Sequence, residues 1–194
     1  GIFGYVTARI KYSTGIDNLR RFQPSMPTRL YDVNGDLIAE LFQEKRELVA
    51  FEEIPPSVIN AFVATEDQGF FDHHGIDPPA IIRAAIKNVF ASIKNLRPTV
   101  VQGGSTITQQ LAKRLFTSSE RTLGRKILEA VLAFQIEKRF TKEEILEMYY
   151  NQIYLGHGCH GIATASRFFY NKEVRYLTVF EGSILAAMPS RPNG

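Results

Sequence analysis

Residues 55–75 read PPSVINAFVATEDQGFFDHHG, and this stretch predicts a helix that runs into a polar loop. The prolines suit the first turn of a helix. One helical stripe, at spacing i, i+3, i+4 and i+7, consists of Ile59, Phe62, Val63 and Glu66. Burial and the negative end of the helix dipole both disfavour a charged carboxyl group on that stripe, so we expect Glu66 to have a raised pKa and to act as a general base or acid. The structural alternative is a helix-terminal glutamate that turns to solvent or accepts a loop N–H.

The loop after Glu66 combines acids, aromatics and histidines and ends at Gly75, a composition typical of functional loops. A zinc site near Cys159 is an alternative use of the histidines. It is disfavoured because adjacent histidines do not easily face one ion and because the spacing matches no standard zinc site. We expect His73 to brace the loop instead. The histidines of the chain are His73, His74, His157 and His160.

The whole chain has the composition of one compact globular unit. Its 194 residues are 44% hydrophobic, which is ample for a packed core. The formal net charge is only +3, so we expect no nucleic acid partner, although a local basic site is compatible with it. The single cysteine excludes an internal disulfide. No run of about 18 apolar residues occurs, so the chain as given has no membrane-spanning helix.

Local patterns predict a mainly α fold with one small hairpin. Residues 30–41, LYDVNGDLIAEL, predict a β-hairpin because Asn34-Gly35 suits a type I′ turn. The pattern from Pro55 onward is helical. Residues 142–151, KEEILEMYYN, form a helix that we interpret as structural, with a core face of Ile145, Leu146 and Tyr149. Helix starts of the capping-box type are expected at Thr117/Glu120, Thr141/Glu144 and Thr178/Glu181.

Residues 102–113 read QGGSTITQQLAK and concentrate hydrogen-bonding groups behind a pair of glycines. A helix N-cap at Ser105 or Thr106 would explain part of this pattern. The functional hypothesis is a helix N-terminus that presents N–H groups, hydroxyls and amides to sugar or phosphate oxygens, with Lys113 adding charge. The pattern GxxxxGK[ST] of a P-loop is absent, so nucleotide binding is disfavoured.

Residues 121–139 form the longest amphipathic segment of the chain. Its apolar stripe is expected at Ile127, Val131 and Phe134. An ordinary surface salt bridge would explain the charges on another side of the helix. These charged residues are Arg125, Lys126 and Glu129.

Taken together, four motifs in this order resemble the peptidoglycan glycosyltransferases. They are EDxxFxxHxG at 66–75, GGSTITQQ at 103–110, RKxxE at 125–129 and KxxILExYxN at 142–151. The likeness runs from about residue 31 to about residue 192, and its first part is more similar to class A penicillin-binding proteins than to their monofunctional relatives. The chain departs from the family at Tyr150, where Leu is usual and which we interpret as packing, and in a longer link at 91–102.

The resemblance implies a mainly α, lysozyme-like fold with two lobes, a cleft between them and the small N-terminal β-hairpin. We expect residues 1–29 to be a linker after an upstream membrane anchor. Residues 30–194 would be the glycosyltransferase domain, truncated before the family's fifth motif, which should follow Asn193. The transpeptidase domain of the bifunctional relatives is absent from this chain and would be a partner in the full-length protein.

The resemblance also implies the reaction and the residues that serve it. An acceptor 4-hydroxyl would attack the anomeric carbon of a donor chain, with inversion to a β-1,4 bond and release of polyprenyl pyrophosphate, so that lipid II is polymerised into glycan strands. The catalytic residues would be Glu66 and Glu129. The substrate and pyrophosphate would be bound by Asp67, Ser105, Thr106, Gln109, Gln110, Lys113, Arg121, Arg125 and Lys126. Phe70 would join His73 in bracing the loop. No cofactor is expected to be required, and Mg²⁺ near Glu129 stays open.

A membrane partner is indicated by the helix at 81–93. Its apolar stripe consists of Ile82, Ile86, Val89 and Ile93, with Arg83, Lys87, Lys94 and Arg97 nearby. A core helix is the structural alternative. Together with the resemblance, this predicts action at the extracytoplasmic (periplasmic) face of the bacterial cytoplasmic membrane.

Two other functions compete with polymerisation. A lysozyme-like lytic hydrolase would use a glutamate of raised pKa as the acid on a glycosidic bond, but it would leave the basic residues unexplained. An inert module that binds glycan or lipid would bind without turnover.

Overall fold

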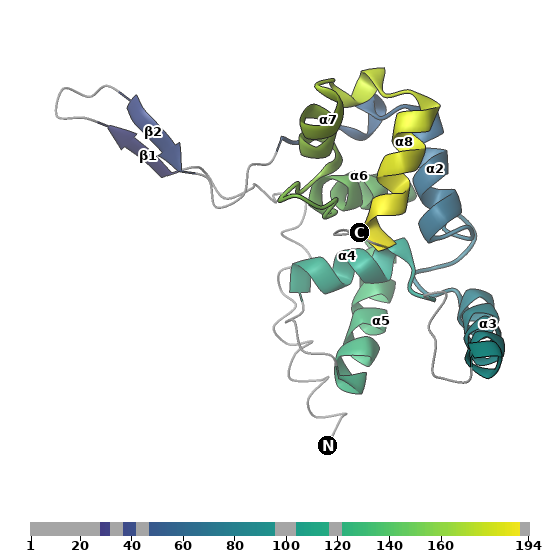
Figure 1. Cartoon of the computed structure of the whole chain (residues 1–194). Coiled ribbons are helices and arrows are strands. Elements are labelled where there is room, and N and C mark those ends of the chain that lie inside the picture. Colours follow the sequence, from purple (N-terminus) through teal and green to yellow (C-terminus); the bar gives the residue numbers. More distant parts are fainter. Residues whose placement is uncertain (1–27, 32–36, 42–46, 96–103, 117–121, 191–194) are drawn as a thin grey trace.

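The computed structural model describes residues 28–31, 37–41, 47–95, 104–116 and 122–190. Within these ranges the chain is mainly helical, as predicted (Figure 1). The helices are α2 (Pro56–Glu66), α3 (Pro78–Asn95), α4 (Ile107–Phe116), α5 (Leu123–Glu137), α6 (Lys142–Gln152), α7 (Ile162–Tyr170) and α8 (Val179–Ala187). The short 3₁₀ helices are η3 (Phe51–Glu53), η4 (Val174–Tyr176) and η5 (Met188–Ser190).

The expected N-terminal hairpin is present as a strand pair. Strands β1 (Thr28–Tyr31) and β2 (Leu37–Leu41) are antiparallel, and the pairing is irregular between Leu30 and Tyr31. The turn predicted at Asn34-Gly35 lies outside the described residues. The same holds for most of the linker predicted at 1–29.

The helix starts follow the local chemistry of the sequence. Pro56 occupies the first turn of α2, where its missing N–H leaves no hydrogen bond unmade. The capping boxes predicted before α6 and α8 are both confirmed. A threonine hydroxyl, from Thr122, also accepts the first-turn N–H of Arg125 at the start of α5. The capping box predicted at Thr117/Glu120 lies outside the described residues.

The helices form two groups (Figure 1). In one group α2 packs against α8, with α6 and α7 beside them; in the other α4 packs against α5. Helix α4 also contacts α6, so it connects the two groups. This arrangement agrees with the two-lobed, lysozyme-like class that was predicted, and it puts α4 at the junction where a site between the groups would form.

The core is built around α6, which confirms the structural role predicted for that helix. Ile145, Leu146 and Tyr149 are completely buried. The neighbouring Tyr150 is also buried, and its ring meets the ring of Phe62 edge-on, with 5.2 Å between the centroids. Tyr150 therefore serves packing, as interpreted from the sequence.

Polar residues of α6 fasten the segment that leads into α2. Asn151 accepts the backbone N–H of Val49 at 2.9 Å and donates to the Val49 carbonyl at 2.9 Å. Glu147 accepts the backbone N–H of Phe51 at 2.8 Å. These contacts explain why the KxxILExYxN pattern combines apolar residues with a glutamate and an asparagine.

The stripe predicted for α5 is wrong, because a different face of this helix is buried. Ile127 and Phe134 are 38% and 45% exposed. The buried residues of α5 are Leu128, Glu129, Leu132, Ala133 and Ile136. Helix α4 packs against the face that carries Glu129, so a carboxylate lies where the pattern predicted charge at the surface.

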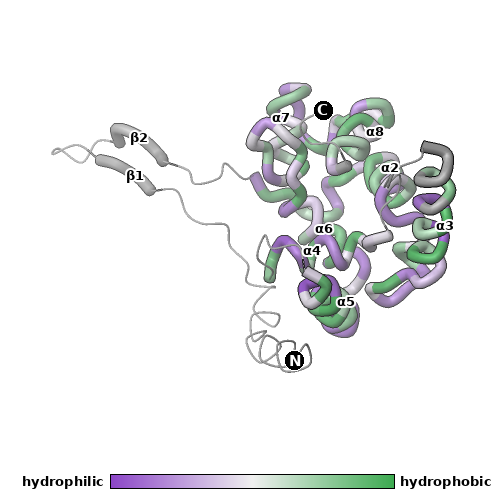
Figure 2. The backbone as a smooth tube through the Cα atoms, turned by 60° about the horizontal axis from the view of Figure 1, so that its bottom comes forward, coloured by the Kyte–Doolittle hydropathy of each residue, from purple (hydrophilic) through white to green (hydrophobic). Residues whose placement is uncertain are grey.

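The outward faces of α3 and α5 expose large apolar residues. On α3, Ile82, Ile86 and Phe90 are 60%, 51% and 69% exposed, and only Ala84 is buried among the described side chains. The hydropathy colouring in Figure 2 shows hydrophobic residues recurring along both helices. Among the described helices, none combines the length and the hydropathy that crossing a membrane would require.

Candidate active site

Glu66 is the last residue of α2 and lies half-buried at the junction of the helix groups. The other members of its stripe, Ile59, Phe62 and Val63, are buried, as the pattern predicted. The Glu66 carboxylate does not turn freely to solvent or accept a loop N–H. Instead, the side-chain amide of Gln110 on α4 donates a hydrogen bond to its Oε2 at 2.8 Å.

The surroundings of Glu66 make its carboxyl group a better base than an exposed glutamate. Desolvation raises its pKa above the ordinary value of 4.5. The hydrogen bond from Gln110 and the charge of Arg114 act in the opposite direction, while the charge of Asp67 raises the pKa further. A carboxylate of raised pKa takes up a proton more readily at neutral pH, which suits a general base.

Asp67 holds the start of the catalytic loop, residues 67–75, against α4. It is only 6% exposed. Its carboxylate accepts the backbone N–H of Ile107 at 2.9 Å, which satisfies a free donor at the N-terminus of α4. The same carboxylate is 3.0 Å from Nε2 of His73. The Asp67 carboxylate is therefore bonded both to the loop and to the start of α4.

His73 closes this loop from the other side. Its Nδ1 accepts the backbone N–H of Gly75 at 3.1 Å, so the neutral ring carries its proton on Nε2 and donates to Asp67. The completely buried ring of Phe70 meets the His73 ring edge-on, with 6.2 Å between the centroids. His73 thus bonds both ends of the loop, and Phe70 packs against its ring, as expected for residues that brace the loop.

The polar residues at the start of α4 divide into two sets. Thr106 and Gln109 are buried and cap the helix reciprocally: Thr106 N–H donates to the Gln109 side chain at 3.1 Å, and Gln109 N–H donates to Thr106 Oγ1 at 3.1 Å. Thr106 also donates to the Gly75 carbonyl at 2.7 Å. These two residues follow the capping alternative. Ser105 and Gln110 are half-buried and contact charged site residues.

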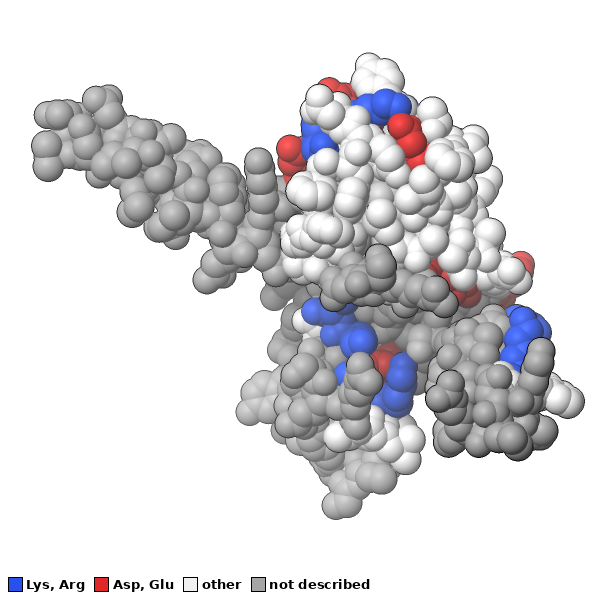
Figure 3. All heavy atoms as spheres, viewed as in Figure 1, with Lys and Arg blue, Asp and Glu red and all other residues white. Residues whose placement is uncertain are grey.

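A cationic cluster surrounds Glu129 on α5. The Glu129 carboxylate is 1% exposed, 3.1 Å from Arg125 Nε and 2.9 Å from Lys126 Nζ. Lys126 also donates to Ser105 at 2.8 Å. Because Glu129 is buried, the alternative of an ordinary surface salt bridge is wrong. Figure 3 shows Lys and Arg side chains gathered over α4 and α5 around an acidic side chain.

Lys113 extends the cationic cluster to α4. Desolvation lowers its pKa from the ordinary 10.5, and so does the charge of Arg125. Lys113 therefore lies in the electrostatic field of the α5 cations, while Gln110, one turn earlier on the same helix, contacts Glu66. Arg121, which was predicted to join this cluster, lies outside the described residues.

The donor set around Glu129 does not fit a divalent cation. Both of its carboxylate oxygens face cationic side chains, which compete with a metal for the same oxygens. Among the described residues there is no group of three or more His, Cys, Asp or Glu side chains that could hold a metal ion. We therefore assign no step to a metal.

Three residues next to the site were not predicted from the sequence: Lys142, Glu137 and Arg114. Lys142, interpreted as part of a core helix, donates to the His73 carbonyl at 2.7 Å and lies 2.7 Å from Glu137 Oε2. Arg114 is one turn beyond Gln110 on α4, and its charge acts on Glu66. Lys142 opens the KxxILExYxN motif, but only the tertiary fold reveals its distant partners.

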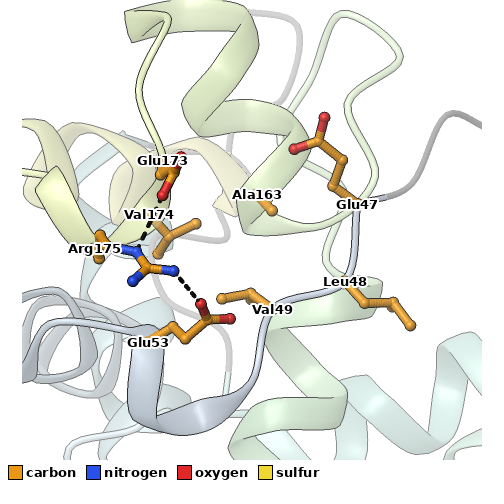
Figure 4. Close-up of a pocket in the computed structure, with 8 residues that line it drawn as sticks. All are labelled: Glu47, Leu48, Val49, Glu53, Ala163, Glu173, Val174 and Arg175. Atoms are coloured by element: carbon orange, nitrogen blue, oxygen red, sulfur yellow. Dashed lines mark hydrogen bonds and ion pairs between the residues drawn. The ribbon is translucent and has the colours of Figure 1, made fainter.

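A separate hollow lies between the segment before α2 and the region of η4. Figure 4 shows Arg175 between Glu53 and Glu173, and distances of 3.1 Å or less join it to both. None of the predicted site residues lines this hollow, so it is distinct from the candidate active site. Its lining residues are Glu47, Leu48, Val49, Glu53, Ala163, Glu173, Val174 and Arg175.

Comparison with known proteins identifies the family. A family model described as Transglycosylase matches residues 34–194. The chain belongs to the transglycosylase family. This transglycosylase domain is 49% identical over 174 residues to penicillin-binding protein 1A of Aquifex aeolicus, which covers 90% of the chain and 23% of that protein.

Two further relatives carry related names. Penicillin-binding protein 1F of Bacillus subtilis is 46% identical over 166 residues, covering 86% of the chain and 22% of that protein. Penicillin-binding protein 1A of Escherichia coli is 40% identical over 193 residues, covering 100% of the chain and 22% of that protein. The transglycosylase domain thus spans a little over a fifth of these relatives, and the predicted resemblance to class A penicillin-binding proteins is confirmed.

Proposed function

We propose that this transglycosylase domain polymerises lipid II into β-1,4-linked glycan strands for the bacterial cell wall. The observation that carries the proposal is the position of α4 between a base and a group of cations. Gln110 on α4 donates to the half-buried Glu66, and Lys113 on the same helix lies in the field of Arg125 and Lys126. A base next to a cationic cluster suits the transfer of a sugar from a pyrophosphate leaving group.

Glu66 would act on the attacking hydroxyl. As the acceptor O4 forms a bond to the anomeric carbon of the donor, its proton passes to the Glu66 carboxylate. The bond from the anomeric carbon to the phosphate oxygen breaks at the same time, and its electron pair leaves with polyprenyl pyrophosphate. One displacement inverts the anomeric configuration, which gives the β linkage.

The cations would stabilise the leaving group. Pyrophosphate gains negative charge as the bond breaks, and Lys113, Arg125 and Lys126 would counter that charge, together with the predicted Arg121. Glu129 is buried between Arg125 and Lys126, so it would hold these cations in place. Ser105, which already bonds Lys126, would add a hydroxyl at the edge of this group.

The remaining predicted residues would support the site through the protein. Asp67, Thr106 and Gln109 are buried and bonded to the loop or to the start of α4. Their role is to hold the catalytic loop in a fixed position against the start of α4. Gln110 would orient the Glu66 carboxylate by direct hydrogen bonding.

The exposed face of α3 would seat the domain on the membrane. The polyprenyl tail of the substrate stays in the bilayer, so part of the domain must lie at its surface. Ile82 and Ile86 are exposed, and Arg83, with a side chain 55% exposed, lies on the same helix. This face would rest on the periplasmic side of the cytoplasmic membrane, and the growing glycan and a transpeptidase domain would be its other partners.

The test is a comparison of two substrates. The chain is incubated with a fluorescent lipid-linked disaccharide and, separately, with finished glycan strands, and the products are separated by length. Polymerisation predicts longer products from the disaccharide and no shortening of the glycan. Shortened glycan would support the hydrolase instead, and binding without either product would support an inert module.

A further inference from the structure

Lys142 and Glu137 form a buried ion pair beside the site, outside the residues that the proposed reaction uses. Lys142 begins α6 and Glu137 ends α5, and their charged atoms are 2.7 Å apart. The Glu137 side chain is 4% exposed and that of Lys142 is 19% exposed. The pair is therefore shielded from the solvent that weakens most surface salt bridges.

The Lys142 ammonium group contacts the catalytic loop at two further points. It donates to the His73 carbonyl at 2.7 Å and lies 4.4 Å from the centre of the Phe70 ring, a cation–π distance. An ammonium group has three N–H donors, and here it contacts the His73 carbonyl, the Glu137 carboxylate and the face of the Phe70 ring. Lys142 thus connects α6 to the loop that begins next to Glu66.

Glu137 makes the matching connection to α4. Its Oε1 accepts a hydrogen bond from the hydroxyl of Thr108 at 2.6 Å, and Thr108 is completely buried in the first turn of α4. The ion pair therefore joins the loop that follows Glu66 to the helix that carries Gln110. A second path closes the ring, because His73 contacts Asp67 and Asp67 accepts the N–H of Ile107 on α4.

Stability alone is a weak reason for such a pair. Removing two charges from water offsets much of their attraction, and apolar replacements of buried pairs are often neutral or stabilising. An apolar pair could not make hydrogen bonds to fixed partners. The charged pair does, because Lys142 bonds the His73 carbonyl in the loop and Glu137 bonds the Thr108 hydroxyl on α4.

We propose that Lys142 and Glu137 are positioning residues of the transglycosylase site, which hold the catalytic loop against α4 so that Glu66 keeps its contact with Gln110. This proposal rests on the proposed function, since it assigns the pair a role in glycosyl transfer. It adds no group that touches substrate.

The first test is Lys142→Met, which keeps much of the side-chain length and removes the charge. A misplaced site should lower kcat on the lipid-linked disaccharide by on the order of 10²-fold, while KM changes by less than about threefold. Lys142→Arg, which keeps the cation, should recover most of the loss. Glu137→Gln, which keeps an acceptor for Thr108, should fall between the two.

The second test measures how kcat depends on pH on the acid side. If the pair only stabilised the fold, Lys142→Met would leave this pH dependence unchanged. Glu66 is influenced by Gln110 and Arg114 from α4, by Asp67 from the loop, and it lies near Tyr149 of α6. Because the hydrogen bond from Gln110 lowers the pKa of Glu66, its loss should raise that pKa. The acid limb of Lys142→Met should therefore shift to higher pH.

The matched control is Lys172→Met. It removes another Lys–Glu pair, Lys172 to Glu181 at 2.6 Å, from the α7–α8 region. The control should lower the melting temperature and leave both kcat and the acid limb unchanged. If Lys142→Met behaves like this control, the pair is only structural and the proposal is wrong.

Hydrogen exchange separates this proposal from the proposed function. In Lys142→Met the amides of residues 67–75 and of Ile107 should exchange faster, whereas Lys172→Met should leave them protected. If the wild-type chain fails to polymerise the disaccharide, the proposed function is wrong, and faster exchange confined to Lys142→Met still supports the positioning role. Unchanged exchange in both variants overturns it.

Discussion

Glu66 is the residue on which the proposed chemistry depends, and the charge of its buried carboxyl group also lowers the stability of the folded chain. Its pKa is raised chiefly because burial disfavours the charged form. Between the ordinary value of 4.5 and the raised value, the folded chain binds more protons than the unfolded chain, so stability falls as pH rises through this window. At neutral pH the ionised group therefore opposes folding.

Glu66→Gln should consequently raise the melting temperature at pH 7, because the amide keeps the shape and lacks the charge. The gain should shrink as pH falls from the raised pKa to 4.5, and it should be absent below 4.5, where the carboxyl group is protonated in both states. Melting curves at pH 7 and pH 4 measure this, with the exposed Glu52→Gln as the control. Equal melting temperatures for wild type and Glu66→Gln at pH 7 would contradict the buried charge.

Gly75 is the second residue with a sharply defined role, because it combines a positive φ of 89° with a close neighbour. A Cβ added there would lie 2.9 Å from the Ala133 backbone. At Gly158, where φ is 76°, a Cβ would meet nothing within 4 Å. The two glycines thus separate backbone strain from steric overlap.

Gly158→Ala should cost only the strain of a left-handed conformation, about 1–2 kcal/mol. Gly75→Ala should cost about 1–3 kcal/mol more from overlap, and should also reduce turnover because Gly75 bonds His73 and Thr106. Denaturant unfolding and the polymerisation assay measure the two effects. Similar unfolding free energies for the two variants would show that the loop yields easily at Ala133.

The sequence predicted the environment of a site residue only where the spacing within a single helix determines it. The stripe of Glu66 was visible because helical spacing alone places it among apolar residues. Thr106 and Gln109 were predicted to bind substrate, yet they form a cap, because a run of polar residues does not show which of them faces inward. Lys142 and Glu137 were missed because their partners are distant in sequence, up to 69 residues for Lys142 and the His73 carbonyl.

At the scale of elements, the fold depends on which face of each helix is turned inward. The start signals of α6 and α8 were read correctly because capping boxes are local. The face of α5 was predicted wrongly, because two apolar stripes are present and the sequence alone does not show which one meets α4. The buried stripe carries Glu129, whose charge is compensated by neighbouring cations.

The contact between α2 and α8 gives a prediction for a single element pair. Gly182 on α8 lies so close to α2 that an added Cβ would be 2.9 Å from Val58 Cγ2 and 3.3 Å from Val58 Cα. Gly182→Ala should therefore destabilise the chain by about 1–3 kcal/mol through overpacking. Chemical denaturation measures the change.

The control uses the neighbour that causes the overlap. Val58→Ala removes Cγ2, so adding Gly182→Ala to it should cost less than adding Gly182→Ala to the wild type. Strictly additive effects would show that the two helices separate instead of pressing on Val58.

At the scale of the whole molecule, the helix groups present different surfaces. The cations of α4 and α5 lie beside the junction, while α3 exposes large apolar side chains away from it. The mainly α class and the family were predictable from motifs. The exposure of Ile82 and Ile86 agrees with the exposed stripe predicted at 81–93, although a core helix would share the same pattern.

Ile82→Ser with Ile86→Ser should weaken binding to anionic liposomes and leave the melting temperature nearly unchanged, since both residues are more than half exposed. Liposome co-sedimentation measures the binding. The matched control, Val179→Ser with Phe180→Ser, removes apolar residues that are 62% and 75% exposed on α8 and should leave binding intact. Unfolding of the α3 variant, or unchanged binding, would contradict a lipid-facing role.

The most direct test of the central claim is the polymerisation rate of Glu66→Gln on a lipid-linked disaccharide at pH 7. The substitution preserves side-chain volume and an acceptor for Gln110 but removes the basic carboxylate. With circular dichroism showing an intact fold, the rate should fall by about 10²–10⁴-fold, the usual contribution of a general base. A folded Glu66→Gln variant that retains more than about a tenth of the wild-type rate would contradict the assignment of Glu66 as the base.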